Sequence, residues 1–190
     1  LETYVYDMAS TLHVALDLFD RLDAPSIAAV HGNAGGAGVS IVAAADLAVV
    51  ADTAKFTLGY SAIGLTPDGS SSYYLTRAVG LKRALDLALT NRTIDAQTAC
   101  DWGLITRLAP AADVLAEAMA LAEQLATRET VVLGATKQLL SEGTNRTLRD
   151  AMAHETENVA WAASRPAVPE SISAFVNRKP RSPHTRRDNQ

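Results

Sequence analysis

The stretch Val30-His31-Gly32-Asn33-Ala34-Gly35-Gly36-Ala37-Gly38-Val39-Ser40 decides how this chain folds. It follows a short apolar run that is typical of a buried strand, and it opens an Ala-rich run that predicts a helix. Three glycines and two alanines at positions 34–38 leave the turn almost without side chains. Backbone N–H groups can then face outward at the start of the helix, where they have no partner inside the helix. The stretch predicts either a backbone site for a negatively charged oxygen or a strand-to-helix turn kept small for packing.

Composition limits the partners that the chain can have. Of its 190 residues, 48% are hydrophobic and 20% are charged, so a sizeable core is possible. The formal net charge of −4 argues against a nucleic-acid partner. No apolar run reaches the roughly 20 residues of a membrane-spanning helix, since Asp46 interrupts the run from Ile41 to Val50. We therefore expect no membrane segment.

The single cysteine, Cys100, bears on the compartment. One cysteine excludes an internal disulfide and favours a reducing compartment, so we expect a cytoplasmic protein. The chain begins at Leu1 rather than at Met, and an upstream targeting signal would lie outside this sequence.

The pattern of the chain changes after Pro110. Before it, short apolar runs alternate with helical patterns, which is typical of an α/β core; after it, the pattern is helical throughout. We expect strands at residues 26–30, 47–50, 55–58 and 104–108. We expect helices at residues 5–22, from the glycine turn to about 45, and at 70–79, 81–89, 95–102, 112–126, 129–142, 147–163 and 170–178. This predicts an α/β core over residues 1–110, a helical oligomerisation layer over 111–180 and a polar tail over 181–190.

Segments along almost the whole chain resemble, in the same order, motifs of the crotonase family, also called the enoyl-CoA hydratase/isomerase superfamily. They are Ala24–Gly32 ("KPVIAAVNG"), Ala34–Gly38 ("ALGGG"), Asp46–Ala51 with Ala54–Phe56 ("CDIRIASENAKF"), Leu65–Gly69 with Leu75–Gly80 ("GIIPGGGGTQRLPRLVG"), Ala96–Ile105 ("AEEALRIGLVNRVV") and Glu170–Phe175 ("EGIxAF"). The match is most similar to Δ3,Δ2-enoyl-CoA isomerase-like and phenylacetate-pathway isomerase-like members. The resemblance implies a spiral of ββα turns, trimers or hexamers, and acyl-CoA thioester substrates without a separate cofactor.

The resemblance also implies an oxyanion hole made of two backbone N–H groups. One would be the N–H of Ala37, with Gly36 beside it where the thioester approaches. Such a preorganised donor stabilises an enolate oxygen strongly. The second donor belongs to an N-terminal motif like "FSAGADL", and nothing in this sequence matches it. We expect the N-terminal third of the family domain to be absent from this sequence.

Two positions where family hydratases carry a catalytic Glu differ here. By the resemblance they are Ser40 and Tyr60. Neither side chain replaces a carboxylate base near pH 7, because the pKa values of serine and tyrosine side chains lie far higher. The usual hydration of an enoyl-CoA is therefore not expected, and a hydratase would be a hydratase by family label only.

Asp68 is a candidate acid/base residue. It lies in Thr66-Pro67-Asp68-Gly69, which resembles loops in which family isomerases carry an acidic residue. A single carboxylate can move a proton from C2 to C4 while an oxyanion hole holds the dienolate. Pro-Asp-Gly is also an ordinary turn sequence. Three classes of function stay open: an isomerase of fatty acid or lipid metabolism, a catalytically silent acyl-CoA binder, and a subunit-interaction fragment without ligand.

The remaining candidates lie at the C-terminus and on the first helix. Phe175 and Arg178 match positions that contact the adenine and phosphate of CoA in the family, and Arg178 can also be a solvated helix end. His13 falls on the polar side of the first helix, where we expect it to be solvated. No spacing of His, Cys and acidic residues predicts a metal site. The apolar helical surface of residues 112–178 predicts a homo-oligomer, a trimer or a hexamer.

Overall fold

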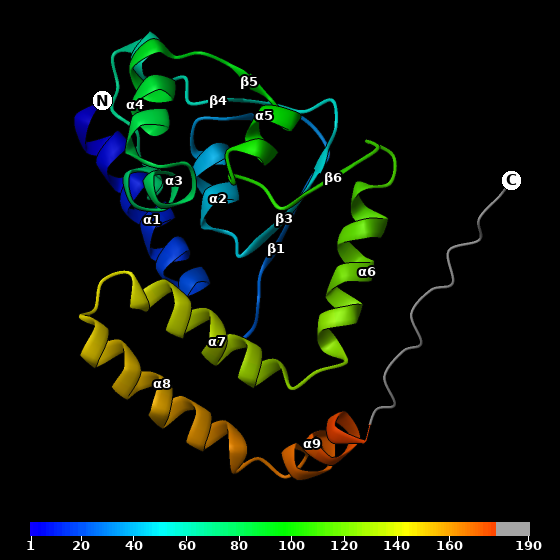
Figure 1. Cartoon of the computed structure of the whole chain (residues 1–190). Coiled ribbons are helices and arrows are strands. Elements are labelled where there is room, and N and C mark those ends of the chain that lie inside the picture. Colours follow the sequence, from blue (N-terminus) through cyan, green and yellow to red (C-terminus); the bar gives the residue numbers. More distant parts are fainter. Residues whose placement is uncertain (178–190) are drawn as a thin grey trace, which may run out of the picture. The chain divides into compact units, whose positions relative to one another are not determined.

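The computed structural model of the chain describes residues 1–177 and divides into two compact units (Figure 1). The first unit is Leu1–Gln138 and contains all the strands of the described residues, and the second begins at Leu139. The sequence-based boundary at residue 110 lies inside the first unit. Helix α6 (Val114–Ala126) packs on two strands of that unit, β1 (Ile27–Val30) and β3 (Leu47–Ala51).

The first sheet is parallel and has the order β1-β3-β6, with β6 formed by Arg107–Ala109. Ile27 pairs with Leu47, and Val49 pairs with Arg107. Four of the five residues of β3 are buried, because a central parallel strand has both faces covered. This is why the chain supplies an uninterrupted apolar run there rather than an alternating one.

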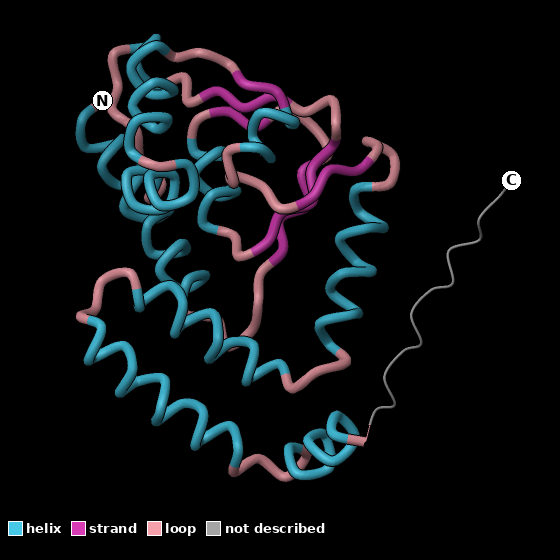
Figure 2. The backbone as a smooth tube through the Cα atoms, viewed as in Figure 1, coloured by secondary structure: helices cyan, strands magenta, loops and turns pink. Residues whose placement is uncertain are grey.

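The second sheet has the order β2-β4-β5 and is formed by very short strands (Figure 2). Strand β2 (Ala34–Gly35) runs parallel to β4 (Lys55–Thr57), and β5 (Ile94–Asp95) runs antiparallel to β4. Chain order is then ββα twice. β1 and β2 lead into α2 (Ala37–Ala44), and β3 and β4 lead into the 3₁₀ helix η1 (Tyr60–Ile63) and helix α3. The predicted succession of ββα turns is confirmed.

Helix α5 (Ala96–Asp101) packs on β4, β5 and β6. The first unit also contains α1 (Glu2–Asp20), α3 (Ser71–Val79) and α4 (Leu81–Thr90), which pack on other helices. Helix α2 packs against α3, and α3 packs against α4. The buried core is apolar and comes from β3, α2 and the helices around them; its largest fully buried side chains include Phe56, Leu87, Val39, Val49, Val50 and Val114.

The strand predicted at residues 104–108 is shorter than expected. The Leu104 N–H donates to the Ala99 carbonyl at 2.9 Å, so this residue closes the turn after α5. The hydroxyl and the N–H of Thr106 both donate to the Ala48 carbonyl, at 2.8 and 3.2 Å. Regular pairing therefore begins only at Arg107.

Three helices complete the described chain: α7 (Thr130–Gly143), α8 (Leu148–Ala163) and α9 (Val168–Val176). Helix α7 agrees with the helix predicted at residues 129–142 to within one residue at each end. Helix α9 starts two residues earlier than expected, because Pro169 is tolerated in its first turn. Neither α8 nor α9 has a fully buried residue. None of the helices in residues 1–177 is both long and apolar enough to cross a membrane.

Candidate functional site

The glycine turn places the start of α2 against strand β4. Gly36 precedes the first helical residue, Ala37, and has φ 52°, a conformation that side chains other than glycine rarely adopt. The Gly36 N–H donates to the Thr57 carbonyl at 3.0 Å, which fixes the turn on β4. At the start of α2 the Val39 N–H donates to the Gly36 carbonyl at 3.0 Å, whereas the N–H groups of Ala37 and Gly38 come too early in the helix to have a partner inside it. The turn therefore leaves backbone donors at the helix start.

The loop that carries Asp68 lies directly on α2. Ser40 is fully buried on this helix, and its hydroxyl donates to the Asp68 carbonyl at 2.9 Å. Gly69 has φ 60°, and a Cβ there would be 3.1 Å from Cβ of Ser40. Only glycine allows so close an approach. Ser40 thus holds the backbone of the loop, although it stands at a position where a carboxylate was expected in hydratases.

Tyr60 contacts the carboxylate of the same residue. Its hydroxyl donates a short hydrogen bond to Oδ1 of Asp68. Burial, together with the hydrogen bond to Asp68 and the charge of that carboxylate, raises the pKa of Tyr60 to about 12. The phenol is therefore neutral and a hydrogen-bond donor throughout the physiological range. The two positions predicted to have lost a carboxylate, Ser40 and Tyr60, both bond to Asp68.

His13 is not merely solvated, as the polar side of α1 suggested. Its Nε2 accepts a hydrogen bond from the Gly69 N–H at 3.2 Å. His13 is exposed, as predicted, but the pattern of α1 alone does not reveal this contact with the Asp68 loop. His13 lies one helical turn before Leu16, the buried residue of α1, and so faces the same neighbours. That spacing is the signal that could have identified it.

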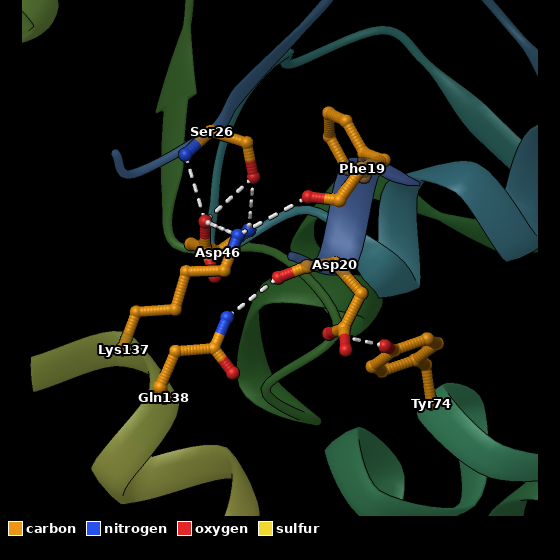
Figure 3. A network of polar contacts seen from close by, with 7 residues as sticks. All are labelled: Phe19, Asp20, Ser26, Asp46, Tyr74, Lys137 and Gln138. Carbon is orange, nitrogen blue, oxygen red and sulfur yellow. Dashed lines mark hydrogen bonds and ion pairs between the residues drawn. The ribbon is translucent and has the colours of Figure 1, made fainter. Parts of the chain in front are cut away.

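A cavity of about 580 Å³ lies beside Asp68. Its walls come from α1, from the Asp68 loop and from the start of α3, and its lining consists of His13, Leu16, Asp17, Asp20, Thr66, Pro67, Asp68, Ser70, Ser72, Tyr73 and Tyr74. One wall is fixed by the Tyr74 hydroxyl, which donates to Oδ1 of Asp20 at 2.6 Å (Figure 3). Sequence reasoning missed Asp20 and Tyr74, since they meet across 54 positions of the chain.

The predicted site residues are brought together only in part. Gly36, Ser40, Tyr60 and Asp68 form one cluster, with Ala37 directly after Gly36. Phe175 is 74% exposed and belongs to the second unit, whereas the cluster belongs to the first. Arg178 lies outside the described residues, as does the tail 181–190.

The chemistry of the cluster is that of a single carboxylate. Asp68 takes part in none of the ion pairs among residues 1–177, and its side chain accepts from a neutral phenol. It is half-buried and lines a polar cavity. Such a carboxylate is available to take a proton or to attack a substrate carbon.

Comparison with known proteins identifies the family. Residues 7–184 match the family described as Enoyl-CoA hydratase/isomerase. The chain is 36% identical over 170 residues to 4-chlorobenzoyl coenzyme A dehalogenase-1 of Arthrobacter sp, covering 90% of this chain and 62% of that relative. It is 34% identical over 159 residues to 1,2-epoxyphenylacetyl-CoA isomerase of Escherichia coli (strain K12), covering 84% of this chain and 61% of the relative. The chain thus spans less than two thirds of these curated relatives.

A solved structure agrees with the sequence matches. An enoyl-CoA hydratase from Polaromonas sp. JS666 superimposes with a TM-score of 0.83 at 36% identity, covering 87% of this chain and 64% of that one. Sequence and fold lead to the same assignment: the chain belongs to the enoyl-CoA hydratase/isomerase family, the crotonase superfamily, and has the crotonase fold.

Proposed function

We propose that the protein shifts a double bond in an enoyl-CoA, with Asp68 as the acid/base residue. The observation that carries this proposal is the cluster around Asp68. At the two positions where family hydratases are expected to have a carboxylate, the chain has hydroxyls, and both of them bond to Asp68. One carboxylate is enough for a 1,3 proton shift, whereas water addition of the family type uses two.

In this mechanism the thioester oxygen accepts a hydrogen bond from the Ala37 N–H at the start of α2. The donor stabilises the negative charge that develops on that oxygen when a proton leaves C2. The Asp68 carboxylate takes this proton and returns one to C4. The overall change moves the double bond and consumes nothing, so no cofactor beyond the substrate's own coenzyme A is needed.

The test is the turnover of a 3-enoyl-CoA by the purified protein and its Asp68→Asn variant. Asparagine keeps the shape of the side chain but cannot take a proton. We expect turnover to fall by roughly 10²–10⁴-fold, the usual range for a general base. Acyl-CoA affinity should change little.

Two outcomes would overturn this assignment. An unchanged rate in Asp68→Asn would remove Asp68 from the reaction. Acyl-CoA binding without any turnover of the wild-type protein would favour the silent binder. As a related expectation, hydration of crotonyl-CoA should be at least about 10³-fold slower than in a relative with both carboxylates.

A second candidate function is hydrolytic dehalogenation of an aryl-CoA. Two observations favour it. The chain is similar over 90% of its length to a relative named 4-chlorobenzoyl coenzyme A dehalogenase-1. His13 lines the same cavity as Asp68. The carboxylate would attack the ring carbon that bears the halogen, and halide would leave. The imidazole of His13 would then take a proton from the water that hydrolyses the aryl ester.

Substrate choice and His13→Gln separate the two candidates. Glutamine keeps an acceptor for the Gly69 N–H but cannot act as a base near neutral pH. If the wild type releases halide from 4-chlorobenzoyl-CoA and His13→Gln does not, the dehalogenase proposal replaces the isomerase proposal. Isomerisation of a 3-enoyl-CoA that persists in His13→Gln would retain the isomerase.

Assembly and CoA binding are further parts of the proposal. Helices α8 and α9 expose several large apolar side chains, among them Trp161, Ile172 and Phe175, which supports a homo-oligomer, a trimer or a hexamer. Phe175 and Arg178 would contact the adenine and phosphate of CoA. Light scattering at micromolar concentration tests the assembly, and a monomer would contradict it. The lone Cys100 supports a cytoplasmic location.

A further inference from the structure

Tyr60 is held rigidly between two glycines with positive φ, Gly59 and Gly64. The Gly59 N–H donates to Oδ1 of Asn91 at 2.6 Å, which ties the start of η1 to the end of α4. The Leu65 N–H donates to the Tyr60 carbonyl at 3.0 Å and closes the other side. The backbone that carries the phenol is therefore tied by a hydrogen bond on either side of it.

The Tyr60 hydroxyl reaches both parts of the candidate site. It donates to Oδ1 of Asp68 and lies 3.7 Å from where a Cβ on Gly36 would be. The hydroxyl thus fills the space between the glycine turn and the carboxylate. Among the described residues, no other side chain donates a hydrogen bond to the Asp68 carboxylate.

The surroundings of Asp68 include several further titratable groups. Helix α1 contributes His13, Asp17 and Asp20 to the shared cavity, and α3 contributes Tyr73 and Tyr74. Helix α2 carries no titratable side chain. Tyr74 bonds to Asp20 rather than to Asp68, so it offers a phenol of the same chemistry aimed at a different carboxylate.

We infer that Tyr60 is a positioning residue for Asp68: its hydroxyl holds the carboxylate in one direction, beside the glycine turn. A hydrogen bond to an ionised group is stronger than one between neutral groups and fixes the direction of both partners. Tyrosine provides this donor without becoming a base, because its own pKa is far above neutrality. The inference rests on the proposed role of Asp68 and adds a role for a position that otherwise counts as a lost catalytic residue.

The kinetic test compares Tyr60→Phe with Tyr74→Phe. Each removes one hydroxyl from a phenol and keeps the ring. For Tyr60→Phe we expect kcat to fall about tenfold with KM unchanged, the size expected for losing a hydrogen bond to an ionised group. Tyr74→Phe, which removes a hydroxyl that bonds to Asp20 instead, should lower kcat less.

A measurement without substrate separates this inference from the proposed function. The NMR resonance of the Asp68 carboxyl carbon, assigned by its absence in Asp68→Asn, reports the hydrogen bond from Tyr60 at a single neutral pH. It should shift in Tyr60→Phe and stay in place in Tyr74→Phe. A resonance that moves in neither variant, or equally in both, overturns the inference. A shift in Tyr60→Phe alone, with no turnover of any substrate by the wild type, overturns the proposed function and leaves the positioning role.

Discussion

Two aspartates of the first unit, Asp46 and Asp68, are both anchored by neighbouring hydroxyls but end in opposite situations. Asp46 accepts from the Ser26 N–H and hydroxyl, each at 2.7 Å, and pairs with Nζ of Lys137 at 3.1 Å (Figure 3). The Lys137 side chain is 8% exposed and that of Asp46 is 24% exposed, so this charge pair is largely removed from water. Asp68 accepts from the Tyr60 hydroxyl, pairs with no cation among residues 1–177, and faces a cavity.

The difference shows how the fold separates structural from reactive carboxylates. A charge that is removed from water needs a partner of opposite charge. Removing either member of such a pair lowers the stability of the folded protein strongly. Asp46 connects the residue before β1 to helix α7, so its contacts stabilise the fold. Asp68 keeps access to a cavity and a neutral donor, which leaves the carboxylate able to react. The comparison predicts that stability depends on the first aspartate and activity on the second.

The largest expected effect on stability is that of Asp46→Asn. Asparagine leaves the buried ammonium of Lys137 without its counter-charge, and we expect a loss of about 3 kcal/mol in the free energy of unfolding. Denaturant unfolding measures it. Asp68→Asn is the matched control and should cost less than about 1 kcal/mol, since a half-buried asparagine still accepts from Tyr60. Equal losses in the two variants would abolish the distinction.

The next prediction concerns the close approach of helix α7 that lets Lys137 reach Asp46. A Cβ on Gly134, one turn earlier on α7, would lie 2.4 Å from the Asp23 carbonyl carbon. Gly134→Ala therefore forces α7 away from the α1–β1 connection, with an expected cost of about 2 kcal/mol. Gly143→Ala at the end of the same helix meets nothing within 4 Å and serves as control. A thermal shift of the same size in both would show that α7 does not need this close approach.

A smaller effect concerns the turn beside Tyr60. Gly36→Ala places a methyl group at ordinary contact distance from Tyr60, so its cost is backbone strain at φ 52°, about 1.5 kcal/mol. Gly35→Ala has its nearest neighbour at 3.9 Å and no unusual φ. Chemical unfolding of the two variants should differ by that amount. A Gly36→Ala protein as stable as Gly35→Ala would mean that the turn adapts freely.

The smallest expected effect appears at alkaline pH. The pKa of Tyr60 is raised to about 12 in the folded protein from an unfolded value of 10.0. Folding then binds the proton more tightly, so this contribution to stability is complete below pH 10 and is lost as the pH rises toward 12. Stability measured between these pH values should fall more steeply in the wild type than in Tyr60→Phe. Parallel pH profiles would contradict the phenol–carboxylate contact.

The sequence predicts the larger elements and a candidate acid/base residue, but not the contacts around that residue. Apolar runs identify β1 and β3, and the family resemblance points to Asp68 and the glycine turn. The two-residue strand β2 and the 3₁₀ helix η1 are too short to leave a periodic pattern. The pair Asp46–Lys137 joins residues that are far apart along the chain, and each of them alone looks like an ordinary surface charge.

Tyr60 and His13 show a second limit. By residue type Tyr60 is a lost carboxylate, and by helical pattern His13 is a surface residue. Both acquire a role only because the Asp68 loop folds onto them. Local sequence carries propensity and periodicity, whereas the direction of a hydrogen bond depends on where a distant loop is placed.

The packing of Ser40 has a consequence for substitutions. Its buried hydroxyl supports the Asp68 carbonyl, and Gly69 approaches it so closely that a longer side chain at position 40 would displace the loop that carries Asp68. A glutamate at position 40 would therefore need the Asp68 loop to move. The residue at position 40 and the placement of Asp68 are coupled, so a carboxylate cannot be added at the first position without changing the second.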